Sequence, residues 1–143
     1  MSYSATKNNV SQYSSVNSYT GVTDASPHQL VQMLLDGALG KLSVVKGLMD
    51  RGETAKKGEV IGQAISIIGG LRSSLDLSKG GEIAANLDNL YEYMERQLIQ
   101  ANLKNDLTII NEVISLLLEI KTAWVTIPAE SRTKPSADLS AVS

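Results

Sequence analysis

The sequence contains no cysteine and no phenylalanine, and only one histidine is present among its 143 residues. Without cysteine the chain has neither disulfide bonds nor thiolate metal ligands. A single histidine cannot build the paired Glu-x-x-His motifs of a di-iron bundle, and no serine has both a base and an orienting acid in the pattern of a hydrolase. We therefore expect a protein that is not an enzyme and that holds no metal or other cofactor.

Neither sign of charge dominates, and no apolar run is long. The 13 lysines and arginines oppose 15 aspartates and glutamates, which gives a net charge of −2 and a pI near 5.4. This balance gives no basic surface for nucleic acid. No segment approaches the roughly 18 uninterrupted apolar residues of a membrane span, and the opening MSYSATKNNV lacks the pattern of a secretory signal. We expect a cytoplasmic protein that neither binds nucleic acid nor inserts into a membrane.

The apolar residues, 43% of the chain, recur at helical spacings of three and four, and no stretch alternates as a strand does. A first helix is predicted to begin after Ser26, whose hydroxyl caps the first turn. Pro27 suits the first helical position, and Gln29 completes a capping box. We expect this helix to run to about Arg51, where Gly52 ends it.

Three further helices follow from similar signals. Thr54 is the predicted N-cap of the second helix and Asp106 that of the fourth, while Gly80 and Gly81 separate the second from the third. The expected ranges are 55–77, 82–103 and 107–125. Four helices of this length joined by short turns predict an all-α fold, an antiparallel up-down four-helix bundle with a short N-terminal arm.

The ends of the chain differ from this middle part in composition. Residues 1–24 are rich in serine, asparagine, threonine and tyrosine, and residues 128–143 are small, polar and punctuated by proline. Such segments bury too little apolar surface to offset the cost of ordering. We predict a flexible arm over residues 1–24, a bundle domain over residues 25–127 and a disordered tail over residues 128–143.

Residues placed at steps of about 100° define the predicted core stripes. These are Leu30, Val31, Leu34, Ala38, Leu42, Val45, Leu48, Ile61, Ala64, Ile68, Leu71, Leu75, Ile83, Leu87, Leu90, Met94, Leu98, Ala101, Ile110, Val113, Leu117, Ile120 and Trp124. The core is almost wholly aliphatic. The single histidine, His28, is expected to be a solvated surface residue in the first turn of its helix.

The fourth helix has more apolar surface than one packing seam needs. Leu107, Ile114, Leu118 and Val125 share a face about 100° from the centre of the core stripe. Two interpretations stay open. The helix is either the most buried member of the bundle, or it presents a docking face for a partner helix.

Glycines inside the first two helices form a second unexplained feature, because each costs about 1 kcal/mol of helix stability relative to alanine. Several of them align with apolar residues on faces away from the core stripe. The predicted troughs comprise Met33, Gly37, Gly40 and Val44 on the first helix and Gly58, Gly62, Ile65 and Gly69 on the second. A visiting helix could approach such a trough closely; ordinary close packing within the bundle is the alternative.

The N-terminal arm carries apolar and aromatic residues at multiples of three, among them Val10, Tyr13 and Tyr19. This spacing is enough for a short amphipathic turn. We expect the arm to cover the partner surface and to be displaced by the partner, which guards an exposed apolar patch at some cost in apparent affinity. A disordered tail with incidental tyrosines is the alternative.

Five stretches of the sequence match one known family. They are ASPHQLVQMLLDGAL (25–39), GQAISIIGGLRSSLD (62–76), GGEIAANLDNLYEYMERQL (80–98), ANLKND (101–106) and EIKTAW (119–124). A Gln-Tyr pair also precedes Ser26 by about thirteen residues, where members of that family often carry an aromatic residue. In this order the stretches resemble the flagellar secretion chaperones known as FliS.

The resemblance implies a helical bundle that binds the C-terminal segment of flagellin in the cytoplasm, prevents its premature polymerisation and keeps it competent for type III flagellar export. It further implies that the bound segment becomes helical along the bundle, and that the N-terminal arm covers part of the same surface. Export-gate components and flagellar regulators are further candidate partners. A self-associating structural bundle, whose spare apolar face meets its own copy, stays open as the alternative.

Overall fold

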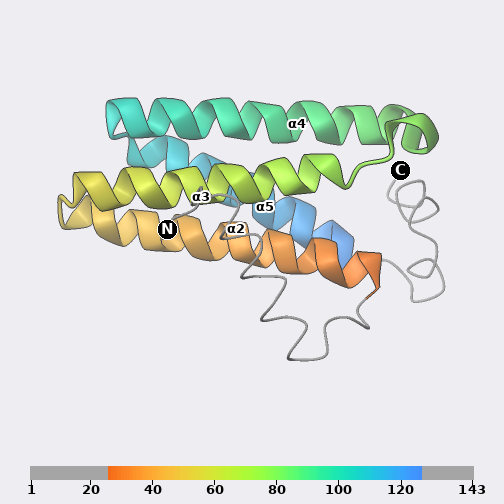
Figure 1. Cartoon of the computed structure of the whole chain (residues 1–143), viewed down its shortest axis with the longest axis horizontal. Helices are drawn as coiled ribbons and strands as arrows, with labels where there is room; N and C mark the ends of the chain where they lie inside the picture. Colours follow the sequence, from red (N-terminus) through yellow and green to blue (C-terminus); the bar gives the residue numbers. More distant parts are fainter. Residues whose placement is uncertain (1–25, 127–143) are drawn as a thin grey trace, which may run out of the picture.

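The computed structural model describes residues 26–126, which form four α-helices joined by short turns. The helices are α2 (Pro27–Asp50), α3 (Thr54–Ser73), α4 (Leu77–Lys104) and α5 (Leu107–Val125). Consecutive helices run in opposite directions along the molecule (Figure 1). This confirms the predicted all-α four-helix bundle. Across these residues no helix is long and apolar enough to cross a membrane.

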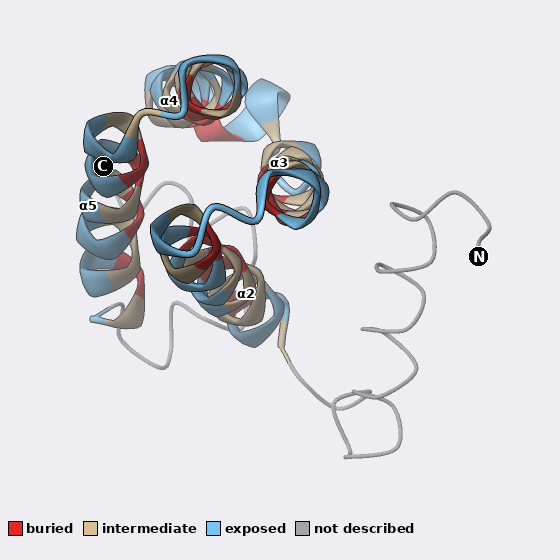
Figure 2. Cartoon of the chain, turned by 90° about the vertical axis from the view of Figure 1, so that its left-hand side faces the viewer, coloured by how far each residue is buried: buried red, intermediate tan, exposed pale blue. Residues whose placement is uncertain are grey.

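The helices are arranged around the bundle in the order of the chain. α2 packs against α3 and α5, and α4 packs against the same two helices. Viewed along the bundle, the four helices occupy the corners of a square with their buried faces turned inward (Figure 2). The α2–α5 seam, where these two neighbours meet at the outer surface, therefore lies on the opposite side of the bundle from the α3–α4 seam.

Local capping starts the first and last helices as predicted. Ser26 Oγ accepts a hydrogen bond from the Gln29 amide at 3.1 Å, and the Gln29 side chain accepts from the Ser26 amide at 2.9 Å. Asp106 caps α5 by accepting from the Thr108 amide at 2.9 Å. These bonds satisfy amides that have no partner inside the helix.

The predicted limits of the second helix are wrong at both ends. α3 begins with Thr54 already helical, so Glu53 is the N-cap, and its side chain makes no capping hydrogen bond. The helix ends at Ser73 and does not reach Leu77. The reason is local, because Ser74 Oγ donates to the Leu71 carbonyl at 2.7 Å and so satisfies an end of the helix.

The two glycines predicted to separate the second and third helices form a kink within α4. Gly81 has φ 59° and ψ −139°, a conformation that residues with a Cβ rarely adopt. One helical turn from Leu77 to Gly80 precedes it, capped by Asp76, and the long straight part of α4 follows it. The predicted start at residue 82 is thus the start of this long part only.

The buried core is aliphatic and largely as predicted. The predicted stripe residues that are buried are Ala38, Leu42, Val45, Leu48, Ile61, Ala64, Ile68, Leu71, Met94, Leu98, Ala101, Ile110, Val113, Leu117 and Trp124. The prediction omitted buried Leu35, Val60, Ala84 and Tyr91. It wrongly included Leu30, which is exposed, because the stripe on α2 passes through Val31 and Leu35 and leaves Leu30 about 100° to one side.

His28 is buried, so the prediction of a solvated histidine is wrong. Its side chain is 1% exposed and stacks on the Trp124 ring, with the ring centres 4.7 Å apart. His28 Nε2 donates to the Trp124 carbonyl oxygen at 2.7 Å, and Trp124 Nε1 donates to the His28 carbonyl oxygen at 2.8 Å. This reciprocal pair joins the start of α2 to the end of α5, a contact between helix ends that periodicity cannot reveal.

At the other end of the bundle a buried lysine joins α3 to α4. Lys57 Nζ donates to the Asn102 carbonyl oxygen at 3.2 Å and to Asn105 Oδ1 at 3.0 Å. Asn105 follows α4 in the left-handed conformation, with φ 53°. A cation is favourable at the C-terminus of a helix, where unpaired carbonyls carry partial negative charge. Lys57 therefore has a structural role that accounts for its burial.

Candidate functional site

The α5 apolar face, which consists of Leu107, Ile114, Leu118 and Val125, is only partly enclosed by the bundle. Leu107 and Leu118 are 44% and 48% exposed. Ile114 is partly buried and packs against the core, and Val125 is partly buried as well. Monomers often expose single apolar residues, but a row of them on one helix face is typical of an interaction surface.

Interhelical polar contacts show that this face borders α2. Lys121 of α5 forms an ion pair with Asp36 of α2 at 2.6 Å, whereas Glu112 of α5 accepts a hydrogen bond from Tyr93 of α4 at 2.7 Å. Leu118 precedes Lys121 by three residues and thus shares its side of the helix. The α5 apolar face therefore lies along the α2–α5 seam.

The α2 outer stripe, which consists of Met33, Gly37 and Gly40, has two members beside the same seam. Met33 and Gly40 stand three and four residues from Asp36 and so share its side of α2. Gly37 is turned by about 100° from Asp36, toward Leu34, which lies 3.8 Å from a Cβ built on Gly70 of α3. Gly40 is exposed, and a Cβ built on it would have no neighbour within 4 Å in the part of the chain that the structure describes. Packing among the four helices therefore does not require glycine at this position. The structure thus brings Met33 and Gly40 of α2 beside the α5 apolar face along one seam.

The α3 outer stripe, which consists of Gly62, Ile65 and Gly69, borders α4 instead. A Cβ on Gly69 would lie 3.7 Å from Glu95 Oε2, an ordinary contact distance, while one on Gly62 would meet nothing within 4 Å. Ile65 is partly buried against the core. The predicted site residues of α3 and those of α5 therefore lie at two different seams, on opposite sides of the molecule.

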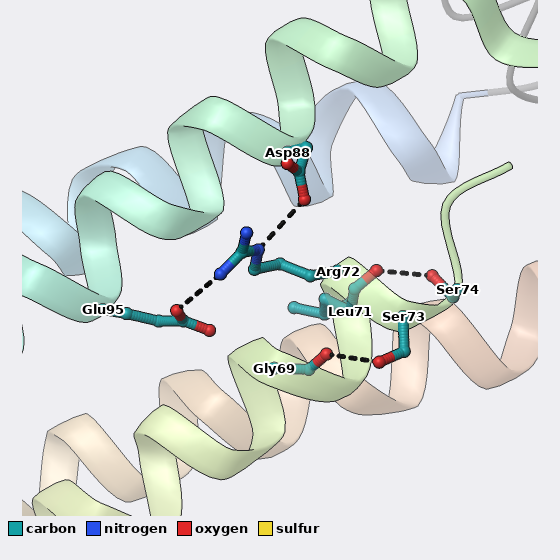
Figure 3. Close-up of polar contacts among 7 residues, drawn as sticks. All are labelled: Gly69, Leu71, Arg72, Ser73, Ser74, Asp88 and Glu95. Carbon is teal, nitrogen blue, oxygen red and sulfur yellow. Dashed lines mark hydrogen bonds and ion pairs between the residues drawn. The ribbon is translucent and has the colours of Figure 1, made fainter. Parts of the chain in front are cut away.

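A charged network crosses the α3–α4 seam next to this stripe (Figure 3). Arg72 Nε pairs with Asp88 Oδ1 at 3.0 Å, and Arg72 Nη1 pairs with Glu95 Oε1 at 2.9 Å. The hydrogen bond to Asp88, together with that to Glu95, raises the pKa of Arg72 above its ordinary value. All three side chains are partly exposed, so the network holds two helices together at a surface that a partner could also contact.

The sequence prediction omitted the charged residues of both seams. Asp36 and Lys121 have a recognisable signal, because each stands three or four residues from members of a predicted stripe. Their pairing depends on how α2 lies against α5, which single-helix periodicity does not specify. Within residues 26–126 no cluster of three or more His, Asp or Glu side chains could hold a metal ion. Val10, Tyr13 and Tyr19 lie outside the described residues.

Comparison with known proteins identifies the family. The family model "Flagellar protein FliS" matches residues 8–131. The chain is 50% identical over 113 residues to "Flagellar secretion chaperone FliSB" of Pseudomonas aeruginosa. This alignment covers 79% of this chain and 90% of that protein. It is 47% identical over 120 residues to "Flagellar secretion chaperone FliS" of Salmonella typhimurium, covering 83% of this chain and 89% of that protein.

A third relative extends the match further along the chain. The "Flagellar secretion chaperone FliS" of Vibrio cholerae is 43% identical over 127 residues, which covers 89% of this chain and 93% of that protein. The match to the family model spans all four helices. The resemblance found in the sequence is confirmed, and the chain belongs to the FliS family, whose members matched here are flagellar secretion chaperones.

Proposed function

We propose that this protein is a cytoplasmic export chaperone that binds the C-terminal segment of flagellin, prevents its premature polymerisation and keeps it competent for type III flagellar secretion. The observation that carries the proposal is the α5 apolar face, where Leu107 and Leu118 stay nearly half exposed after the core has closed. The names of the relatives support a role in flagellar secretion.

The energetics require a large contact. A disordered segment that folds on binding costs about 2–5 kcal/mol in ordering, which its contacts must offset. Covering the exposed halves of Leu107 and Leu118 contributes about 1 kcal/mol each, half of what full burial of a leucine contributes. Two leucines alone barely meet this cost. A partner segment therefore needs more of the surface, and the α2 and α3 outer stripes supply it.

Open glycines suit a partner that binds as a helix. Among residues 26–126 no atom lies within 4 Å of a Cβ built on Gly40 or Gly62. A visiting helix can approach closely there, and aliphatic surfaces of this kind tolerate variation in the partner's sequence. Because the α3 outer stripe and the α5 apolar face lie on opposite sides of the bundle, we propose that the flagellin segment wraps around the molecule and does not lie along one seam only.

Co-purification tests the proposal. The full-length chain should capture full-length flagellin and should fail to capture flagellin that lacks its C-terminal segment. Equal capture of both forms would place the binding site elsewhere. Light scattering at micromolar concentration separates the alternative, since a chaperone gives a one-to-one complex with flagellin, whereas a self-associating structural bundle dimerises without it.

A further inference from the structure

Among the described residues, one ion pair crosses the α2–α5 seam, and it joins Asp36 of α2 to Lys121 of α5. Lys121 Nζ lies 2.6 Å from Asp36 Oδ1. On α5, Lys121 stands between Leu118 and Val125, and on α2, Asp36 stands between Met33 and Gly40. The spacings of three and four place each charge on the same side of its helix as its apolar neighbours. The pair therefore interrupts the apolar surface in the middle.

The pair keeps unused hydrogen-bonding capacity. The Asp36 side chain is 48% exposed and that of Lys121 is 35% exposed. A carboxylate accepts about four hydrogen bonds, and one oxygen of Asp36 is engaged by Lys121. The carboxylate is thus the more exposed partner, and it is accessible to a hydrogen-bond donor from outside the bundle.

Covering this pair with a purely apolar helix is unfavourable. Removing charges from water has a penalty that the remaining ion pair does not offset unless its free lone pairs gain new partners. A helix with a hydrogen-bond donor at the matching position supplies such a partner to the carboxylate. A wrong register, with an aliphatic residue over the pair, leaves the carboxylate unsatisfied.

We infer that Asp36, held by Lys121, is a specificity-determining residue of the flagellin site and sets the register of the bound helix. It accepts a hydrogen bond from an arginine, lysine, glutamine or asparagine side chain on the otherwise apolar face of the flagellin C-terminal helix. Lys121 is a positioning residue, because it orients the carboxylate. This inference rests on the proposed function and specifies the chemistry of the same surface.

A double-mutant cycle tests the inference with the full-length chain and purified flagellin from the same organism. Asp36→Asn should weaken flagellin binding about tenfold, as expected when a covered charged hydrogen bond is lost. Each arginine, lysine, glutamine and asparagine of the flagellin C-terminal segment is replaced by methionine in turn. At one position the replacement should weaken binding to the wild-type chaperone and should have little further effect on the Asp36→Asn variant.

A charge reversal separates recognition from structural support. The double variant Asp36→Lys with Lys121→Asp restores the ion pair across the seam, so its melting temperature should stay within about 4 °C of wild type, as befits a partly exposed pair. Its flagellin affinity should nevertheless stay at least about tenfold reduced, because the carboxylate now stands on the other helix. Glu53→Gln, which removes the exposed Arg51–Glu53 pair outside the seam, is the matched control and should bind as wild type does.

The outcomes are distinct. Wild-type affinity in the reversed variant, or the absence of coupling at every flagellin position, would overturn the inference while leaving the proposed function intact. If the wild-type chain does not bind flagellin at all, the proposed function fails and this inference fails with it. Weak binding of the reversed variant together with a coupled donor position would support the assignment.

Discussion

His28 and Trp124 close the bundle at the end where α2 begins and α5 finishes. Each ring packs on the other, and each side chain donates to the carbonyl oxygen of its partner. Among the four described helices, α5 contacts α2 and α4 and does not pack against α3. The pair is thus a main anchor of α5 on α2 and fixes the width of the seam between them at that end.

His28→Ala is expected to lower the free energy of unfolding by about 2–4 kcal/mol. The substitution removes a buried ring and a buried hydrogen bond and leaves a cavity beside Trp124. Urea denaturation followed by circular dichroism measures the effect. Lys46→Ala, at an exposed site of the same helix, should change the value by less than about 0.5 kcal/mol. A similarly small change for His28→Ala would show that the His28–Trp124 pair contributes little to the free energy of unfolding.

Gly40→Ala and Gly62→Ala should each raise the free energy of unfolding by up to about 1 kcal/mol. Both positions are helical, and a Cβ meets no atom of the described helices within 4 Å, so the gain in helix propensity is the main effect. Thermal unfolding of the two variants checks this. Gly81→Ala is a contrasting control, because its positive φ makes alanine strained, and it should destabilise the protein. A loss of stability at Gly40 or Gly62 would mean that the space there is already filled.

At the scale of the helix, Asp76, the N-cap of α4, makes the stability of the fold depend on pH. The Asp76 carboxylate accepts two hydrogen bonds, one from Ser78 Oγ at 2.7 Å and one from the Lys79 amide at 3.2 Å. These bonds, that from Ser78 first, lower the pKa of Asp76 below the ordinary 3.8. A lowered pKa means that the folded state favours the charged form. The resulting stabilisation is present above the ordinary pKa and is lost as the pH falls through the folded value.

Asp76→Asn should therefore reduce the acid sensitivity of the fold. Asparagine also caps helices well but does not titrate, so the variant should lose less stability between pH 6 and pH 3 than the wild type does. Urea denaturation at the two pH values measures the difference. Identical acid sensitivity in both proteins would show that other carboxylates account for it. Glu92→Gln, at an exposed site of α4, is the control.

At the scale of the helix, the sequence predicts the features that depend on residues close together in the chain. The capping box of Ser26 and Gln29, the Asp106 cap and the aliphatic stripes are local signals, and the structure confirms them. His28 could not be placed, because its burial depends on Trp124, which lies 96 residues away. The early end of α3 depends on a single serine hydroxyl that competes with the helix, a choice that periodicity does not resolve.

The candidate site was predictable to a similar extent. Wheel positions identify which residues lie off the core stripe, and Leu107 and Leu118 are indeed exposed. The neighbour of each face depends on how the helices pack. The prediction therefore named a face or trough on each helix without saying which of them adjoin, and the structure places the α3 trough and the α5 face at opposite seams. The assignment of these residues to flagellin binding remains a prediction.

At the scale of the whole molecule, the N-terminal arm is expected to compete with the partner. Deleting residues 1–19, which include Val10, Tyr13 and Tyr19, should leave the affinity for flagellin unchanged or increase it, because a covering segment reduces the fraction of binding-competent chaperone. Isothermal titration with full-length and truncated chains measures the effect. Marked weakening on truncation would show that the arm itself contacts flagellin. Circular dichroism confirms that the truncated chain is still folded.

The placement of the stripes on opposite sides of the bundle leads to the strongest test of a wrapping partner. Leu118→Glu places a charge in the α2–α5 seam, and Gly62→Leu fills the open space of the α3 outer stripe. Each variant should weaken flagellin binding at least about fivefold. Circular dichroism should show that the fold of each is unchanged. The seams are separated by the core, so the two losses should multiply in the double variant, as independent sites do. Ala123→Glu, at an exposed site of α5 away from the seam, controls for the added charge, and Gly62→Ala controls for the side-chain size. If only one of the two substitutions weakens binding, flagellin lies along that seam and does not wrap around the bundle. We expect both substitutions to weaken binding, because burial of Leu107 and Leu118 alone barely offsets the cost of ordering the flagellin segment.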